Sequence, residues 1–599
     1  MQKKVCFYIV LLISLFYSLG NAQTVFYVDQ TNGDDNNNGI SPSTAFQTFE
    51  KAANSVTQNN NSQGDTIKIM GEYHNPVFDE DFKYTGVDSI AHLWNAEKTI
   101  FVSDLHGKAN KYITITNYDN NTILRGDGSN IVRIINSSYI NFEGFNIEGM
   151  VDSIPLSTAH SLQFVYIRYN NSEPLEGTTT APSASDIHYR NDDEIIDGDG
   201  IIESTDKFTD LSNYSVVRPS YIDTRGIYIS NCNNVNLSNN KIHHMPGGGL
   251  RVSESKDITI KANEIYRTSA KSYSGTHALV VTKTKPSSKQ YSITIENNDV
   301  HHNYNEQYSW APTKTKITPR IDEGKGISLQ RNNTNAWKGV NNSSRILVKN
   351  NLSYWNGYSG FHSNDGYKID FINNTAFCNH YTNTITYANG EQKGKNFGIS
   401  AQKGDDIKFY NNISVVSVPD DVPAWHGHAI SSANTTQLEV KNNVSFDLQG
   451  NLELDPDVVE INRKIANPMF KDAPSAFEDQ NYDFDFHLTN ASPAIDYADT
   501  TKAPKMDFEG NPRALLNSDD DGAYEFGIYW NGKISNDWHT NGNWSNNLIP
   551  TATDSITIPA AANYNYYPKV NSNAQIKKLF MNGDGQLIID QNAILNIEP

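Results

Sequence analysis

Short runs of β-branched and polar residues that end in asparagine recur along the middle of the chain. Their final residues are Asn240, Asn263, Asn298, Asn351, Asn374, Asn412 and Asn443. A small residue stands 14 positions before five of these asparagines, at Gly226, Gly249, Gly360, Gly398 and Ala429. Two signals locked at a fixed offset indicate one repeating structural unit, and the spacing from Asn240 to Asn263 is 23 residues.

A coil of about 23 residues that carries three short strands is typical of a right-handed parallel β-helix. Equivalent residues of successive coils then lie about 4.8 Å apart in columns. We therefore predict an all-β fold, in which the asparagines form one internal ladder and the glycines line up at another corner. The longest insertions fall mainly between the third strand of one coil and the first strand of the next, as at 303–322, 379–396 and 414–427. We expect these loops to wall a groove over the sheet of first strands.

The first residues predict a secretory signal peptide at 1–22. Lys3 and Lys4 precede an apolar stretch, and small residues follow before Gln23. This pattern predicts a secreted or cell-surface protein with no membrane insertion, and the periplasm is the alternative. We divide the remaining chain into an N-terminal cap with the first coils at 23–110, a β-helix at 111–527 with insertions at 151–222 and 303–322, and a β-rich module at 528–599.

Several segments carry a family resemblance. The opening FYVDQTNGDDNNNGISPSTAFQTFEKA at 26–52 resembles that of secreted right-handed parallel β-helix proteins related to polysaccharide lyases of Bacteroidota. NPMFKDA at 467–473 and DFEGNPR at 507–513 resemble their closing segment. The resemblance implies a helical N-terminal cap and carbohydrate chemistry. From Trp530, WNGKISNDWHTNGNWS resembles a small β-rich module of secreted, multidomain Bacteroidota proteins.

The charge distribution favours an anionic polymer as the substrate. The formal net charge of −20 argues against nucleic acid as the main partner. Strand alternation nevertheless gathers cationic and aromatic side chains on the outward face of the first strands, where Tyr228, Arg251, Ser328, His362 and Ser400 are expected. A local cationic strip in an acidic protein suits a uronate-containing polysaccharide or oligosaccharide. We expect a monomeric protein.

This residue set suits β-elimination at a uronic acid. The reaction needs a base for the C5 proton, a cation for the carboxylate and an acid for the leaving oxygen. Arg251 is the predicted carboxylate clamp, and Tyr228 is the predicted acid. Lys325 is the predicted base, because arginine neighbours would lower its pKa. His362 is the competing base.

Further residues are predicted to bind the substrate or a metal. The substrate-binding candidates are Lys271, His277, Trp310, Trp355, His244 and His302. The resemblance also implies Ca²⁺, and hard oxygen ligands for it stand at Asp322, Glu323, Asn364 and Asp365. His243 and His301 align with Tyr266 and Tyr354, which predicts a stacked aromatic column. Cys232 and Cys378 should lie about four coils apart, so we expect free thiols.

Four functions remain open at this point. The first is a polysaccharide lyase, and the second is a dehydratase that expels water from a terminal uronate by the same elimination. The third is a C5 epimerase, in which the proton returns to the opposite face. The fourth, from a different class, is a non-catalytic glycan-binding protein or adhesin. A hydrolase is the weaker enzyme hypothesis, because we find no paired-aspartate motif of the kind that inverting hydrolases need.

Overall fold

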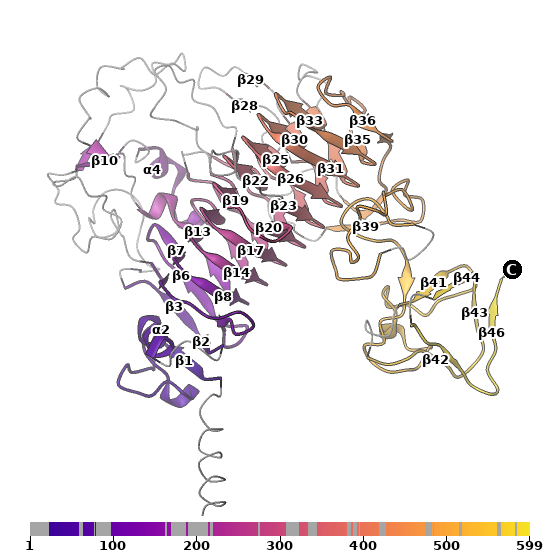
Figure 1. The fold of residues 1–599 in the computed structure, drawn as a ribbon, viewed down its shortest axis with the longest axis horizontal. Coiled ribbons are helices and arrows are strands. Elements are labelled where there is room, and N and C mark those ends of the chain that lie inside the picture. Colours follow the sequence, from indigo (N-terminus) through magenta and orange to yellow (C-terminus); the bar gives the residue numbers. More distant parts are fainter. Residues whose placement is uncertain are drawn as a thin grey trace, which may run out of the picture.

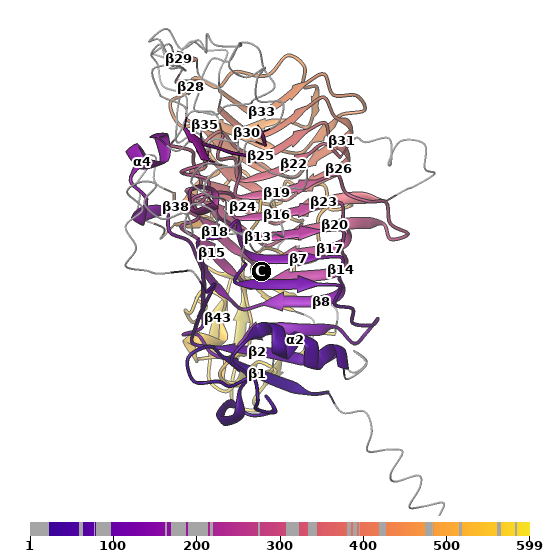
Figure 2. The same ribbon diagram turned by 90° about the vertical axis from the view of Figure 1, so that its left-hand side faces the viewer.

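The protein is a parallel β-helix, as predicted: three long parallel sheets run side by side along one stack of coils (Figures 1 and 2). The computed structural model describes residues 23–598, apart from residues 59–63, 77, 79–97, 162–164, 169–186, 190–213, 216–219, 273–275, 307–322, 333–343, 380–384, 387–391, 394–395, 418–426, 474–481, 483, 514–517, 560–564 and 582–583.

Sheet 1 contains the first strand of each coil, and Figure 2 shows its strands stacked from β7 to β33. Its strands are β4 (Ile100–Ser103), β7 (Asn130–Ile135), β13 (Arg225–Ser230), β16 (Leu250–Ser253), β19 (Leu279–Thr282), β22 (Ile327–Gln330), β25 (Ser359–Asn364), β30 (Asn396–Gln402) and β33 (Gly427–Ala433).

Sheets 2 and 3 contain the second and third strands. Sheet 2 comprises β1 (Val25–Asp29), β2 (Thr66–Met70), β5 (Ile113–Asn117), β8 (Ser138–Glu143), β14 (Asn233–Ser238), β17 (Lys256–Lys261), β20 (Tyr291–Glu296), β23 (Arg345–Lys349), β26 (Tyr367–Ile372), β31 (Asp405–Tyr410), β34 (Glu439–Lys441) and β36 (Glu460–Ile461). Sheet 3 comprises β3 (Glu72–His74), β6 (Ile123–Arg125), β9 (Asn146–Glu148), β15 (Lys241–His243), β18 (Glu264–Tyr266), β21 (Asp299–His301), β24 (Leu352–Tyr354), β27 (Thr375–Phe377), β32 (Ile413–Val416), β35 (Val444–Asp447) and β37 (Lys464–Ile465).

The predicted register is confirmed along sheet 1. Ile227 pairs with Leu250, and Phe361 pairs with Ile399, so the preceding glycines align as expected. These inward side chains are fully buried in one continuous apolar core. The glycine pattern missed the first strand of the Asn298 coil, β19, because Ala278 occupies the glycine position and extra residues separate β19 from β20.

The predicted asparagine ladder is confirmed between sheets 2 and 3. Each side-chain amide donates to the Oδ1 atom of the next asparagine, for example from Asn240 to Asn263 at 3.0 Å and from Asn374 to Asn412 at 3.0 Å. The same Oδ1 atoms accept the backbone N–H of the preceding asparagine, as in the 2.9 Å bond from Asn374. The ladder ends where Asn443 donates to the Oε1 atom of Glu460 at 2.9 Å. Every amide of the turn is therefore used inside the helix.

A second, outward row of asparagines precedes the ladder. These residues have positive φ values, such as 52° at Asn350 and 53° at Asn373, a backbone region that asparagine tolerates well. Their side-chain amides donate to backbone carbonyls of a closing segment, defined here as residues 467–526. The bonds run from Asn297 to Asp507, Asn350 to Met506, Asn373 to Asp520, Asn411 to Asp499 and Asn442 to Tyr497. The closing segment is thus bonded to five coils.

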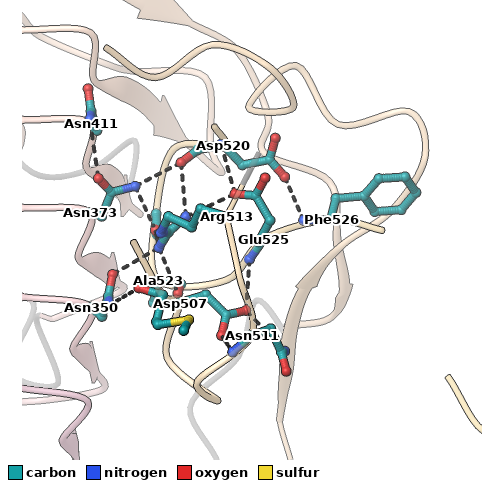
Figure 3. Close-up of polar contacts among 12 residues, drawn as sticks. Asn350, Asn373, Asn411, Asp507, Asn511, Arg513, Asp520, Ala523, Glu525 and Phe526 are labelled. Carbon is teal, nitrogen blue, oxygen red and sulfur yellow. Dashed lines mark hydrogen bonds and ion pairs between the residues drawn. The ribbon is translucent and has the colours of Figure 1, made fainter. Parts of the chain in front are cut away.

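Arg513 is the centre of this docking (Figure 3). Its guanidinium forms an ion pair with Glu525 at 3.2 Å, and both side chains are 1% exposed. It also donates to Oδ1 of Asn350 at 2.9 Å and to the carbonyls of Gly522 and Ala523 at 2.9 and 3.0 Å. A buried arginine with this many acceptors fixes the segment to the coil wall.

The two ends of the stack are built differently. At the N-terminal end, α2 (Phe49–Gln58) begins after Thr48, whose hydroxyl accepts the N–H of Lys51, and it buries Phe49, Ala52 and Val56 against the first coils. At the other end, the module from residue 528 has its own core around Trp530, Trp538 and Trp544. Its strands are β40 (Ile528–Tyr529), β41 (Ser555–Ile558), β42 (Lys569–Val570), β43 (Ala574–Ile576), β44 (Lys578–Met581), β45 (Ile588–Ile589) and β46 (Leu595–Ile597).

Smaller elements decorate the helix. They are η1 (Pro42–Thr44), η2 (Val151–Ser153), α4 (Leu156–Ser161), η5 (Ser220–Asp223), η7 (Asn541–Asn543), and the antiparallel strands β10 (Val165–Arg168), β11 (Ile187–Tyr189), β12 (Tyr214–Ser215), β28 (Ile385–Thr386), β29 (Gln392–Lys393), β38 (Phe470–Asp472) and β39 (Asp485–Leu488). Cys232 and Cys378 are free and buried, as predicted. Within the described ranges, no helix is both long and apolar enough to cross a membrane.

Candidate functional site

The outward face of sheet 1 carries one column of side chains in exact register from coil to coil. The column reads Phe101, Arg133, Tyr228, Arg251, Val280, Ser328, His362, Ser400 and Ser431. Arg133, Tyr228 and Arg251 are partly exposed, whereas every member from Val280 onwards is buried. The cationic part of the face is therefore accessible from the N-terminal coils.

A compact cluster lies where strands β22 and β25 begin. We call His277, Glu323, Lys325, Tyr358 and His362 the Lys325 cluster. The Nζ atom of Lys325 lies 2.5 Å from Oε2 of Glu323 and 4.7 Å from the centroid of the Tyr358 ring. Oε2 of Glu323 also lies 3.6 Å from Nε2 of His277. The backbone N–H of Lys325 donates to Nδ1 of His277 at 3.4 Å, which orients that imidazole.

Both histidines of the cluster are neutral. Burial holds the pKa of His362 well below its usual value, and the nearby charge of Lys325 lowers it further. Burial and the charge of Lys325, followed by that of Arg251, lower the pKa of His277 in the same way. Nδ1 of His362 lies 2.7 Å from Oγ of Ser400. A neutral imidazole next to an ammonium group is a suitable arrangement for proton abstraction.

Arg251 differs from the other cations of the site because it lacks a partner. Among the described residues, no hydrogen bond or ion pair reaches its guanidinium. Burial and the charge of Arg225 lower its pKa, so the protein environment is short of negative charge there. Three coil steps separate Arg251 from His362 in the column, which is about 14 Å. Tyr228 stands one coil before Arg251, and the guanidinium of Arg133 lies 5.4 Å from its ring centroid.

The predicted calcium ligands do not come together as one set. Glu323 lies before β22 and bonds to Lys325, whereas Asn364 and Asp365 lie at the opposite end of the β25 strand. Asp322 lies outside the described residues. Within the described parts of the chain, no group of three or more His, Cys, Asp or Glu side chains is arranged to hold a metal ion. The described ligands therefore do not fit a single calcium ion, and no step below uses one.

Three of the predicted substrate-binding residues, Trp355, His302 and His244, lie at sheet 3 instead of sheet 1. Trp355 is buried in an apolar cluster of sheet 3, where Phe377 packs against it edge to face. His302 is 1% exposed, under Tyr482 and Phe484 of the closing segment. The predicted position on the groove face was therefore wrong for these residues. The predicted aromatic column of His243, Tyr266, His301 and Tyr354 is confirmed by centroid distances of 5.0, 5.1 and 4.8 Å.

The remaining binding candidates have mixed positions. His277 belongs to the Lys325 cluster. Lys271 is buried and bonded to Glu306. His244 lies at sheet 3, 3.5 Å from Asp152. Trp310 lies outside the described residues. Two residues that the sequence pattern missed, Arg133 and Val280, belong to coils without the glycine signal.

Part of the chain closes the C-terminal end of this face. The hydroxyl of Ser431 donates to Asp455 at 2.7 Å, and the backbone N–H of Ser432 donates to the same carboxylate at 3.0 Å. Nδ1 of His428 lies 3.0 Å from the carbonyl oxygen of Glu453. Polar groups at β33 are therefore bonded within the protein.

Comparisons with known proteins identify the fold and leave the reaction open. A family model described as a right-handed β-helix region matches residues 194–342, and a domain of unknown function, DUF8693, matches residues 529–599. No curated protein matches the chain. Similar solved structures include pectate lyase Pel9A, with 14% identity, a TM-score of 0.41, and coverage of 84% of this chain and 97% of the other.

Two further structures have different activities. A GH136 lacto-N-biosidase from Eubacterium ramulus shares 11% identity at a TM-score of 0.37, with coverage of 74% of this chain and 67% of the other. The A-module of mannuronan C-5 epimerase AlgE4 from Azotobacter vinelandii shares 10% identity at a TM-score of 0.35, with coverage of 73% and 95%. A lyase, a glycosidase and an epimerase at these scores give no basis for choosing a reaction.

Proposed function

We propose that the protein is an exported carbohydrate-active enzyme that performs β-elimination on a uronate-containing polysaccharide or oligosaccharide. The observation that carries the proposal is the unpartnered guanidinium of Arg251, which shares one sheet face with the neutral imidazole of His362. A partly buried cation without a counter-ion is unfavourable unless a ligand supplies the anion. A uronate carboxylate has the required charge and a planar, two-oxygen shape.

We assign the base to His362 rather than to Lys325. Nζ of Lys325 forms an ion pair with Glu323 at 2.5 Å, and an ammonium group has no lone pair with which to accept a proton. The imidazole of His362 is already neutral. Binding of an anionic sugar beside it raises the proton affinity of the imidazole, since the negative charge favours the imidazolium. The base therefore becomes stronger when the substrate arrives.

The other residues stabilise charge around the reacting carbons. His362 takes the C5 proton, the C4–C5 double bond forms, and the C4–O bond breaks. Lys325 lies close enough for its charge to act on His362, so we assign it to the carboxylate of the reacting sugar. Arg251, about 14 Å away, then binds the carboxylate of a neighbouring sugar. The leaving oxygen takes a proton from Tyr358, whose ring contacts Lys325, rather than from the more distant Tyr228.

Dehydration of a terminal uronate and C5 epimerisation use the same first step. The closed C-terminal end of the face, at β33, favours a bound chain end and therefore dehydration or exo-lytic release over internal cleavage. The non-catalytic alternative predicts sugar binding without product formation. We also propose that residues 1–22 direct export and that the enzyme acts as a monomer.

The test is incubation with a panel of uronate polysaccharides and oligosaccharides, followed at about 235 nm for unsaturated products, with product masses from mass spectrometry. Elimination gives an absorbance rise, and a loss of 18 mass units, the mass of water, marks dehydration. We expect His362→Gln to lower the rate by roughly 10²- to 10⁴-fold. Arg251→Met should chiefly raise KM, and a chelator should leave the rate unchanged.

Lys283→Met is the matched control, because this lysine is exposed and pairs with Glu254 outside the cluster. It should behave as the wild type does. Sugar binding with no mass change for any substrate would favour the non-catalytic glycan-binding protein over the enzyme. Full activity of His362→Gln would refute the assignment of the base.

A further inference from the structure

The contacts of His362 form a chain of hydroxyl groups that leads away from the site. Nδ1 of His362 lies 2.7 Å from Oγ of Ser400, and Oγ of Ser400 lies 3.3 Å from Oγ of Ser359. The hydroxyl of Ser359 lies 3.0 Å from the backbone carbonyl oxygen of Phe361. All four groups are buried, so water does not complete these bonds.

Counting hydrogens assigns a direction to the chain. The carbonyl of Phe361 has no hydrogen, so Ser359 is the donor in that bond. Ser359 has then used its one hydrogen, and Ser400 must donate to Ser359. Ser400 in turn can only accept from His362, which places the imidazole hydrogen on Nδ1. The Nε2 atom is left with its lone pair.

The charges around the imidazole keep the ring neutral. The charged and titratable groups that act on it are Lys325, His277 and Glu323, and the ammonium group is the strongest of them. A nearby cation favours the neutral imidazole over the imidazolium. Ser400 comes from β30 and Ser359 from the start of β25. The hydrogen-bonded chain from Ser359 through Ser400 to His362, which we call the relay, therefore joins two coils.

We propose that Ser359 and Ser400 are positioning residues that hold His362 as the Nδ1–H tautomer and keep Nε2 available as the base. The inference rests on the proposed function and adds two residues to it. Ser359 acts without contacting the imidazole. Its loss leaves the Ser400 hydroxyl without an acceptor, and that hydroxyl then rotates to donate to Nδ1. The result is the Nε2–H tautomer, which cannot accept the C5 proton.

The kinetic test compares single and double variants. Ser359→Ala should lower kcat by roughly 10- to 100-fold at nearly constant KM, which is the usual size of an effect on a residue that orients a functional imidazole. Ser400→Ala should cost less, because both tautomers then occur. The double variant should match Ser400→Ala, since Ser359 has no role once Ser400 is lost. Ser400→Thr, which keeps the hydroxyl, should restore the rate.

Ser292→Ala is the control. This serine is equally buried but lies on β20 of sheet 2, away from the site, where its hydroxyl donates to the carbonyl of Lys285 at 2.8 Å. It should leave kcat unchanged. Equal losses in Ser359→Ala and Ser292→Ala, or additive losses in the double variant, would overturn the relay.

A second measurement does not depend on activity. Solid-state NMR of protein labelled with ¹³C and ¹⁵N at histidine reports the tautomer from the ring shifts, and subtraction of the His362→Gln spectrum assigns His362. We expect Nδ1–H in the wild type and Nε2–H in Ser359→Ala. An Nε2–H wild type would overturn the relay whatever the activity. The expected tautomers without any product would leave the relay intact and refute the proposed function.

Discussion

Two arginines show how differently the protein treats its two polar regions. Arg513, between the coils and the closing segment, bonds to Glu525, to Asn350 and to three backbone carbonyls. Arg251, on the outward face of sheet 1, has no hydrogen-bonded or ion-paired partner among the described residues. Both are held by the same stack of coils. The first region pairs its arginine with a carboxylate inside the protein, and the second leaves a cation for something outside the protein.

The difference separates stability from function on one scaffold. An arginine paired inside the protein contributes to folding, and its loss leaves a buried charge without a partner. An incomplete network costs stability, and such a cost is typical of a site that a ligand completes. The comparison can be tested by changing matched residues in the two regions.

The largest effect is expected from the arginines themselves. Arg513→Met should lower the free energy of unfolding by about 3–5 kcal/mol, because it leaves the carboxylate of Glu525 buried and unpaired. Arg251→Met should leave stability unchanged or raise it, because it removes repulsion from Arg225. Urea unfolding of the two variants measures both values. Equal losses of unfolding free energy in the two variants would show that Arg251 also stabilises the fold, and the two arginines would then not differ in role.

The next prediction compares the two asparagine rows, which are the internal ladder and the outward row that bonds to the closing segment. Asn374→Ala should lower the free energy of unfolding by roughly 2–4 kcal/mol, since it leaves the side-chain amide of Asn351 and a buried carbonyl without hydrogen-bond partners. Asn373→Gly keeps the left-handed backbone and loses the bonds to the closing segment and the bond that Oδ1 accepts from Asn411, so it should lower the free energy of unfolding by about 1–2 kcal/mol. Thermal unfolding ranks the two. A larger loss at Asn373 would mean that docking, rather than the ladder, holds the coils.

The next effect depends on pH and should come from Asp299 of sheet 3. Burial raises the pKa of Asp299 to about 6. A carboxyl with a raised pKa binds its proton more tightly in the folded state, so stability falls as pH rises from about 4 to 6. Asp299→Asn should therefore match the wild type near pH 4 and be about 2–3 kcal/mol more stable near pH 7. Unfolding at both pH values tests this. A constant difference across that range would contradict it.

The smallest effect is expected from the C-terminal module. Its three tryptophans form a separate core, so removal of residues 528–599 should change the stability of the β-helix by less than about 1 kcal/mol. Elimination kinetics should also stay constant. Calorimetry of the truncated and full chains measures the first quantity. A large loss of β-helix stability would show that the module contributes to the same network as the closing segment.

The parts of the fold that repeat were predictable from the sequence. The ladder asparagines and the strand glycines occur at fixed offsets, and a column of identical contacts has to repeat with the coil. The outward asparagines were visible as Asn-Asn pairs, but their role was missed because the partner segment lies more than 50 residues away in every case. The buried position of His302 was missed for the same reason, since Tyr482 and Phe484 lie against it.

The candidate site was only partly predictable. Strand alternation placed Arg251 and His362 in one outward column, and the structure has them there. The ion pair between Lys325 and Glu323 could not be read from alternation, because both residues precede the strand. The relay through Ser359 and Ser400 needs atomic distances, since serine is common on outward strand faces.

The closing segment also affects how the β-helix unfolds from its C-terminal end. A stack of coils ordinarily frays from its last coil inwards, since each coil is held only by its neighbours. Here residues 497–520 are bonded to five successive coils, from the coil of Asn297 to that of Asn442. The last of these coils is therefore held by the closing segment as well as by its neighbouring coil. Unfolding from this end is therefore a single event with a high barrier, and the lifetime of the folded chain exceeds what the strength of one coil contact would give.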